Sequence, residues 1–263
     1  MTRSSLKNVM KLIDSAKQEL PVEQSFLNDL KRSIEFDSAK TGHIPSKTYK
    51  PSSMNCIRSM YYQIVGVEPD ESHPSYNFVN ICNSGTDTHE RIQKYVANMI
   101  NNNMDCVYVD VAQFVKDRGL DYLDVVSKNG METKLYHKTL NMSFLCDGII
   151  KYKNHYYILE IKTETINKWY MREYVDSGHY NQGIAYSIAF GIPDVIFVYI
   201  NRDMLDMKAY MFTPSDEMKE EWLSRISECD NYVNSLKVPD KPDNILKKTC
   251  NYCIYASRCR EDG

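Results

Sequence analysis

The sequence lacks any long apolar run. No stretch approaches the roughly 18 consecutive apolar residues that a membrane-spanning helix needs. The first 20 residues carry interspersed charges and lack the apolar segment of a signal peptide. We therefore expect a cytoplasmic protein, in a compartment where thiols stay reduced. Tyrosine is abundant, with 20 residues, which is compatible with an AT-rich viral gene, so the expectation includes a phage-encoded protein acting in the host cytoplasm.

The sequence also lacks a strong excess of charge, internal repeats and low-complexity tracts. It has 32 Lys and Arg residues against 35 Asp and Glu residues, a net charge of −3. A nucleic acid would therefore have to bind in a local groove, because overall charge would not attract it. The 263 residues suffice for one large domain or two small ones with a sizeable core.

The expected elements follow the order helix, strands, helix, strands, helix. Residues 1–37 have helical apolar spacing and residues 38–53 are loop-like, so we expect a helical arm over 1–48 and a main domain over 49–263. The order predicts an α/β fold with a central mixed sheet flanked by helices. Helices are expected at 56–65, 84–100, 175–190 and 215–236, and strands at 106–115, 132–137, 143–152, 155–163, 195–201 and 206–212, followed by a loop-like, cysteine-rich tail.

A hairpin is expected around Lys153 and Asn154, which separate two apolar runs. It brings Asp147 on the first run beside Glu160 on the second. An unpaired Glu is costly to bury on an apolar strand, and two converging carboxylates form a site for a hard cation such as Mg²⁺ or Mn²⁺. A surface hairpin with an ordinary Glu–Lys pair is the alternative, since such pairs are common.

Lys162 follows Glu160 by two residues, so the two side chains share one face of a strand. Leu159 and Ile161 then point the other way, into the core. A lysine in this place can orient the attacking water or help to deprotonate it, while a bound metal stabilises charge on a phosphate. Together with Asp147, these residues predict a catalytic centre.

This arrangement resembles the PD-(D/E)XK nuclease superfamily, whose pattern is an Asp, a spacer with a hairpin turn, and Glu-x-Lys. Here it reads Asp147, a 12-residue spacer and Glu160-Ile161-Lys162, with Cys146 in the place of the family's proline. The resemblance implies a restriction-endonuclease-like core that binds Mg²⁺ or Mn²⁺. It also implies that Asp147, Glu160 and the Ile161 carbonyl hold this metal.

Two further segments resemble the RecB-like branch of the superfamily. The helix around His89 resembles its Gly…His motif, which implies that His89 is a metal ligand. Gln182 and Tyr186 resemble its Gln-x-x-x-Tyr motif, which implies DNA contacts beside the active site, and their spacing places both on one helix face. Singly, His89 would be an ordinary helix-face residue and Tyr186 a core residue; their order around the hairpin favours the nuclease. Glu132, on the preceding strand, is a further candidate near the metal.

Eight cysteines in a reducing compartment call for burial, catalysis or metal binding. Cys250, Cys253 and Cys259 form a C-x₂-C-x₅-C cluster, which indicates a metal site without a local fourth ligand. This spacing resembles AddB-type and CRISPR-associated RecB-like exonucleases, in which an upstream cysteine, here Cys56, adds the fourth ligand. The resemblance implies a structural [4Fe–4S] cluster, and zinc stays open as the alternative. The other cysteines are expected to be small buried hydrophobes: Cys82, Cys106, Cys146 and Cys229.

The sequence therefore predicts a metal-dependent DNA nuclease, which we expect to be an exonuclease on single-stranded ends. Recombination, repair, CRISPR adaptation and phage DNA processing all stay open, as does work inside a larger recombination or repair assembly. The rival hypothesis is a non-catalytic DNA-binding or assembly subunit of the same fold, but the Asp, Glu, Lys and His of the motifs are all present. Candidate substrate contacts besides Gln182 and Tyr186 are Arg58, Lys168, Tyr170 and Arg172.

Overall fold

The computed structural model describes residues 21–40, 46–71, 74–243, 245 and 247–263. The chain divides into two compact units, one within residues 1–43 and 72–81 and the other within 44–71 and 82–263. The helix expected in the first 20 residues lies outside the described residues, and the expected boundary at residue 48 stays a prediction. Among the described helices, none combines the length and apolar character that crossing a membrane requires.

The first unit is helical, as the sequence predicts. It contains α2 (Val22–Lys40) and the first residues of α4 (Tyr76–Asn98). Glu35 Oε1 accepts a hydrogen bond from the backbone N–H of Tyr76 at 3.0 Å, and Lys31 Nζ lies 4.9 Å from the centre of the Tyr76 ring. Several apolar side chains of α2 are exposed.

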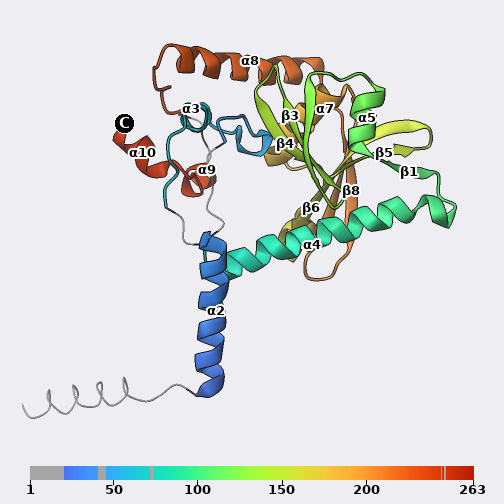
Figure 1. Ribbon diagram of the computed structural model, residues 1–263, viewed down its shortest axis with the longest axis horizontal. Coiled ribbons are helices and arrows are strands. Elements are labelled where there is room, and N and C mark those ends of the chain that lie inside the picture. Colours follow the sequence, from blue (N-terminus) through green and yellow to red (C-terminus); the bar gives the residue numbers. More distant parts are fainter. Residues whose placement is uncertain (1–20, 41–45, 72–73, 244, 246) are drawn as a thin grey trace, which may run out of the picture. The chain divides into compact units, whose positions relative to one another are not determined.

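The second unit is built on two β-sheets (Figure 1). The larger sheet has the order β1-β5-β6-β7-β8; β6 and β7 are parallel and the other neighbours are antiparallel. The smaller sheet is antiparallel, in the order β2-β3-β4. The α/β fold with a restriction-endonuclease-like core is therefore confirmed. The strands are β1 (Cys106–Val109), β2 (Leu123–Asn129), β3 (Glu132–His137), β4 (Met142–Cys146), β5 (Gly148–Tyr152), β6 (His155–Glu164), β7 (Val195–Asn201) and β8 (Met207–Phe212).

Helices cover both faces of the larger sheet. Ile92 of α4 packs with Leu159 and Ile161 on one face. On the other face, Ile184 of α7 belongs to the same core cluster as Phe197 of β7. Burying apolar area on both faces is the main stabilisation of such a sheet. The helices and 3₁₀ turns of this unit, besides α4, are η1 (Pro51–Ser53), α3 (Ile57–Val65), η2 (Ile100–Asn102), α5 (Val111–Asp117), α6 (Ile166–Met171), η3 (Ser177–His179), α7 (Tyr180–Phe190), α8 (Asp216–Asn234), α9 (Lys247–Asn251) and α10 (Ala256–Glu261).

A glycine lets α7 approach the sheet closely. A Cβ atom added to Gly183 would lie 2.7 Å from the ring of Phe212 and 3.4 Å from that of Phe197. Real Cβ atoms need more room, so any side chain here would push the helix outward. Gln182, the preceding residue, is thereby held close to the polar face of β6.

The strand expected at 106–115 ends after Val109. Asp110 stops it, because its carboxylate accepts a hydrogen bond from the backbone N–H of Gln113 at 2.9 Å and so caps α5. The apolar run that follows is a helix packed on the core. Helix α4 begins at Tyr76, before the expected start at 84, and α7 begins at Tyr180, after the expected start at 175. The sequence analysis did not predict β2, α6, α9 or α10.

The apolar run 143–152 is two strands, although its continuity favours one. β4 pairs with β3 in the smaller sheet, whereas β5 pairs with β1 and β6 in the larger one. The break falls at Asp147. The next residue, Gly148, leaves room for Tyr108, whose ring would lie 2.6 Å from an added Cβ. Asp147 therefore stands where the two sheets meet.

Candidate active site and cysteine cluster

Asp147 is held firmly at the sheet junction and is only 5% exposed. Its Oδ2 accepts the backbone N–H of Ile161 at 2.7 Å. Its backbone carbonyl accepts two bonds of 2.6 Å, one from Gln93 Nε2 on α4 and one from the Tyr108 hydroxyl on β1. These contacts fix the orientation of the carboxylate and leave Oδ1 facing His89.

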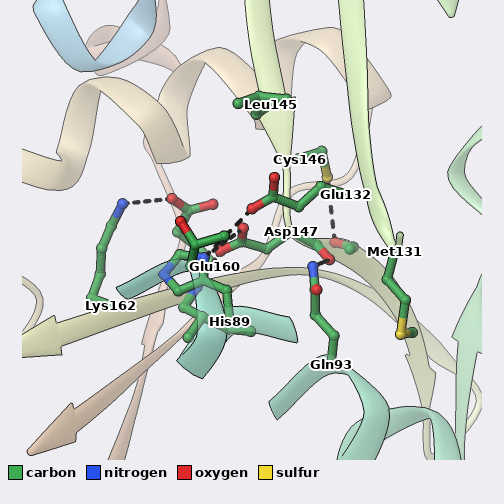
Figure 2. A network of polar contacts seen from close by, with 12 residues as sticks. His89, Gln93, Met131, Glu132, Leu145, Cys146, Asp147, Glu160 and Lys162 are labelled. Carbon is green, nitrogen blue, oxygen red and sulfur yellow. Dashed lines mark hydrogen bonds and ion pairs between the residues drawn. The ribbon is translucent and has the colours of Figure 1, made fainter. Parts of the chain in front are cut away.

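His89 and Glu132 form a group with Asp147 (Figure 2). His89 Nδ1 lies 3.1 Å from Asp147 Oδ1 and 3.8 Å from Glu132 Oε1. Burial disfavours the imidazolium, but the hydrogen bond and charge of Asp147 outweigh it and raise the pKa of His89. Burial, together with the charge of Asp147, raises the pKa of Glu132. One ligand atom of each residue lies within 4.8 Å of the other two, a spacing that suits a bound divalent cation.

Glu160 lies beside this group with 3% of its surface exposed. Its Oε1 accepts hydrogen bonds from Lys162 Nζ at 2.6 Å and Gln182 Nε2 at 3.0 Å. Its Oε2 is buried and has no hydrogen-bond partner among the described residues. Burial raises the pKa of Glu160 to about 7 against the opposing charge of Lys162. An unpaired buried carboxylate oxygen is costly, so this atom fits the place of a cation ligand.

A chain of hydrogen bonds leads from Lys162 to the smaller sheet. Lys162 Nζ donates to Gln182 Oε1 at 2.8 Å, and Gln182 Nε2 donates to the Tyr186 hydroxyl at 3.2 Å. That hydroxyl donates to the Leu145 carbonyl at 2.8 Å. Gln182 and Tyr186 thus share one helix face, as their spacing predicts. Tyr186 is 2% exposed and its hydroxyl accepts a hydrogen bond from Gln182, so it helps to hold the Gln182 side chain in place. A DNA contact by either residue stays a prediction.

The structure brings His89, Asp147, Glu160, Lys162 and Gln182 together as the motifs predict. Ile161 supplies its N–H to Asp147, while the role of its carbonyl as a metal ligand stays a prediction. Glu132, the further candidate near the metal, belongs to the group with His89 and Asp147.

Two residues of the site escaped the sequence analysis. Gln93 stands four residues after His89 on α4, so helical spacing could have found it. Tyr108 has no such signal, because its contact depends on the close approach permitted by Gly148.

The candidate contacts on the α6 segment have different surroundings. Arg172 donates from Nε to Glu164 Oε2 at 2.8 Å and from Nη2 to Asp176 Oδ2 at 3.0 Å. Its guanidinium also stacks over the Tyr199 ring at 4.4 Å, so these contacts occupy Arg172. Tyr170 is 60% exposed and Lys168 is also exposed, and their contacts with a substrate stay predictions.

The four cysteines expected as cluster ligands line one pocket: Cys56, Cys250, Cys253 and Cys259. Burial raises the pKa of Cys56, and the nearby Cys253 and Cys259 raise it as well. No three of these sulfur atoms lie within 4.8 Å of one another, as far as the described residues show. Among the remaining cysteines, Cys82 is exposed, which corrects the expectation that it is buried.

Arg58 lies in this pocket and is 4% exposed. Its Nε donates to the Pro239 carbonyl at 2.7 Å, and its Nη1 lies 3.2 Å from the Cys259 carbonyl and 3.6 Å from the Cys259 sulfur. A substrate contact by Arg58 stays a prediction, but these bonds give it a place beside the sulfur atoms. Two neighbouring contacts also join α3 to the tail: the Tyr62 hydroxyl bonds Asp262 at 2.7 Å and its ring lies 5.8 Å from that of Tyr255.

No protein-family model matches the chain, and no curated protein matches it. Solved structures resemble it at low identity, two of them as follows. "Crystal structure of SSO0001" is 16% identical, with 89% of this chain and 96% of that chain covered and a TM-score of 0.45. "Crystal Structure of LHK-Exo in complex with dAMP" is 11% identical, with 73% and 92% covered and a TM-score of 0.41. Both TM-scores lie below 0.5.

Proposed function

We propose that this protein is a metal-dependent deoxyribonuclease, a phosphodiester hydrolase that uses Mg²⁺ or Mn²⁺ and acts as an exonuclease on single-stranded DNA ends. The observation that carries the proposal is the buried Oε2 of Glu160 beside Asp147 and His89, which has no hydrogen-bond partner within the described part of the chain. Folding leaves a carboxylate oxygen in this costly state where a ligand outside the chain satisfies it. A hard divalent cation is the ligand that matches carboxylate and imidazole donors together.

The cation ligands would be Asp147, Glu160 and His89, joined by Glu132 and the Ile161 carbonyl. The cation would acidify a bound water and offset charge on the phosphate. The bond from the Ile161 N–H fixes the Asp147 carboxylate in position as a ligand. Gln93 bonds the backbone carbonyl of Asp147, so this ligand is oriented from two sides.

Lys162 would position the nucleophile. An ammonium group has three N–H donors, and here one reaches Glu160 and another reaches Gln182. The third donor is left for the attacking water or for a phosphate oxygen. Gln182 fixes the direction of the lysine, because its amide bonds both Lys162 and Glu160.

The cysteine pocket would hold a [4Fe–4S] cluster. The four cysteines line one pocket, and four thiolates are the ligand set of such a cluster. The cluster would join Cys56, the N-cap residue of α3, to the tail and so close a very long loop, which would make its role structural. Anaerobically purified protein should be brown with iron and sulfide bound; a colourless, zinc-loaded protein would overturn this assignment.

The activity is tested on end-labelled single- and double-stranded DNA with Mn²⁺. We expect the wild type to release nucleotides from single-stranded ends and to spare circular single strands. Lys162→Ala should lower this activity by about 10²–10³-fold with an unchanged circular dichroism spectrum. The control Lys116→Ala, at an exposed residue of α5, should remain active. Equal activity of Lys162→Ala and wild type would refute the assigned site. A wild type that binds DNA but never cleaves it would instead establish the non-catalytic subunit.

A further inference from the structure

We propose that the open face of the smaller sheet binds the nucleic-acid strand next to the metal group, with Lys134 and Lys50 contacting successive backbone phosphates. This inference rests on the proposed function, because it names where the substrate of that site continues. The metal group stands at one end of this face, through Glu132 on β3 and Asp147 just after β4.

Strand register places Lys134 next to the metal group. Lys134 follows Glu132 by two residues on β3, so both side chains lie on the same face, about 6.6 Å apart along the strand. The intervening Thr133 is buried, which shows that Glu132 and Lys134 occupy the other, open face. Leu145 is the partner of Lys134 on β4 and is 51% exposed. In Figure 2, Leu145 lies on the strand that leads to Cys146 and Asp147.

Lys50 reaches the same face from the far side of β4. Tyr49 bridges Met142 in parallel register, and its carbonyl accepts the backbone N–H of Ser143 at 2.9 Å. Residues 49 and 50 therefore continue the sheet beyond β4. The alternation of faces puts the buried Tyr49 on the core side and Lys50 on the open side. Burial and the charge of Lys134 lower the pKa of Lys50, which fits two ammonium groups close together.

Neither lysine has a carboxylate partner among the described residues. The ion pairs that lysines form in the described chain involve other positions, such as Lys128 with Asp110 and Lys138 with Asp124. Two neighbouring cations without counter-charge repel each other, and a bound polyanion would relieve that repulsion. A phosphodiester backbone supplies negative charges at regular short spacing.

The rest of the open face suits a nucleic-acid strand. Ser127 on β2 pairs with Lys134 and Asn129 pairs with Glu132, so a hydroxyl stands beside Lys134 and an amide stands beside the metal group. Leu145 offers an apolar surface to a sugar or a base. The face is extended and begins at the metal group, so a strand with its scissile phosphate at the metal would run along it. A free phosphate or mononucleotide would occupy only one end.

The test is binding of fluorescent oligothymidylate in EDTA, where a metal-dependent nuclease does not cleave. Each contact to a single strand contributes about 0.7 to the slope of log K against log salt, which is about five-fold in affinity at about 0.1 M salt. We therefore expect about five-fold weaker binding for Lys134→Gln and for Lys50→Gln, a shallower slope for each, and a larger loss for the double variant. Lys134→Arg should retain affinity, and thymidine monophosphate should bind all variants equally.

The matched control is Lys128→Gln, since Lys128 opposes the buried Thr133 and lies on the other face of the same sheet. Wild-type affinity of the Lys134 and Lys50 variants, or a loss equal to that of Lys128→Gln, would overturn this inference while leaving the nuclease proposal intact. If the Lys134 and Lys50 variants bind DNA more weakly but the wild type never cleaves it, the result would support the binding face and refute the nuclease proposal. A wild type without affinity for DNA would overturn both.

Discussion

The buried Oε2 of Glu160 has no hydrogen-bond partner among the described residues, so we expect a bound cation to raise the thermal stability of the protein without any substrate. A cation that binds only the folded state stabilises it by RT ln(1 + [L]/Kd), about 2.7 kcal/mol when its concentration is 100 times Kd. In a chain of this size, 1 kcal/mol moves the melting temperature by roughly 2–4 °C. Saturating Mn²⁺ should therefore raise the melting temperature of the wild type by about 5–11 °C. The substitution Glu160→Gln should remove most of that shift.

The same substitution should stabilise the protein when EDTA removes the metal. Burial raises the folded-state pKa of Glu160 from 4.5 to about 7, so its charge opposes folding above pH 4.5 and opposes it fully above pH 7. The difference corresponds to about 3 kcal/mol at pH 8, an upper figure for this group. A glutamine keeps the acceptor for Lys162 and Gln182 and replaces the unpaired charged oxygen by a neutral amide group. We expect a net gain of about 1–3 kcal/mol in the free energy of unfolding.

The assay is thermal denaturation at pH 8, followed by circular dichroism, in EDTA and in Mn²⁺. Glu90→Gln is the matched control, because Glu90 follows His89 on α4, is exposed and pairs with Lys94. It should melt like the wild type under both conditions. The reasoning fails if Mn²⁺ does not stabilise the wild type, or if Glu160→Gln gains as much from Mn²⁺ as the wild type does.

Three further predictions follow from single contacts. Lys162→Ala should lower the single-turnover cleavage rate by about 10²–10³-fold, the usual loss for a positioned donor, and a loss below ten-fold would contradict its role. Gly183→Ala should destabilise by about 1–3 kcal/mol in urea unfolding despite the better helix propensity of alanine, since its Cβ would meet Phe212; a neutral effect would show that α7 can shift. Burial and the charge of Lys162 lower the pKa of His179 to about 4, so the unfolded state binds the extra proton first and stability should fall from pH 6.5 to pH 4. Urea titrations should show a flatter pH profile for His179→Gln, and an unchanged profile would exclude His179 as the cause.

The sequence predicted the parts of the site that lie along one strand or one helix. Alternation on β6 predicted the faces of Glu160 and Ile161, and the turn at Lys153 and Asn154 is confirmed by positive φ angles of 48° and 67°. Helical spacing placed Gln182 on the same face as its partner four residues on. These patterns have short periods, so a single sequence is enough to detect them.

What the sequence could not predict depends on contacts between distant segments. The break at Asp147 arises because β4 and β5 pair with different sheets, and a continuous apolar run hides that choice. The bond from the Tyr186 hydroxyl to the Leu145 carbonyl is another such contact, because it joins α7 to the smaller sheet. The local sequence does not show which sheet supplies the pairing strand, so the apolar run 143–152 predicts a single strand.

The cysteine pocket also depends on contacts between distant segments of the chain, and the folded structure shows which contacts these are. The C-x₂-C-x₅-C spacing groups three ligands, but nothing local connects Cys56 to them. In the folded chain, the bonds from Arg58 and Tyr62 hold α3 against the tail. Protein contacts of this kind would offset part of the entropic cost of closing the long loop around a metal. The metal would then lock an arrangement that these protein contacts already favour.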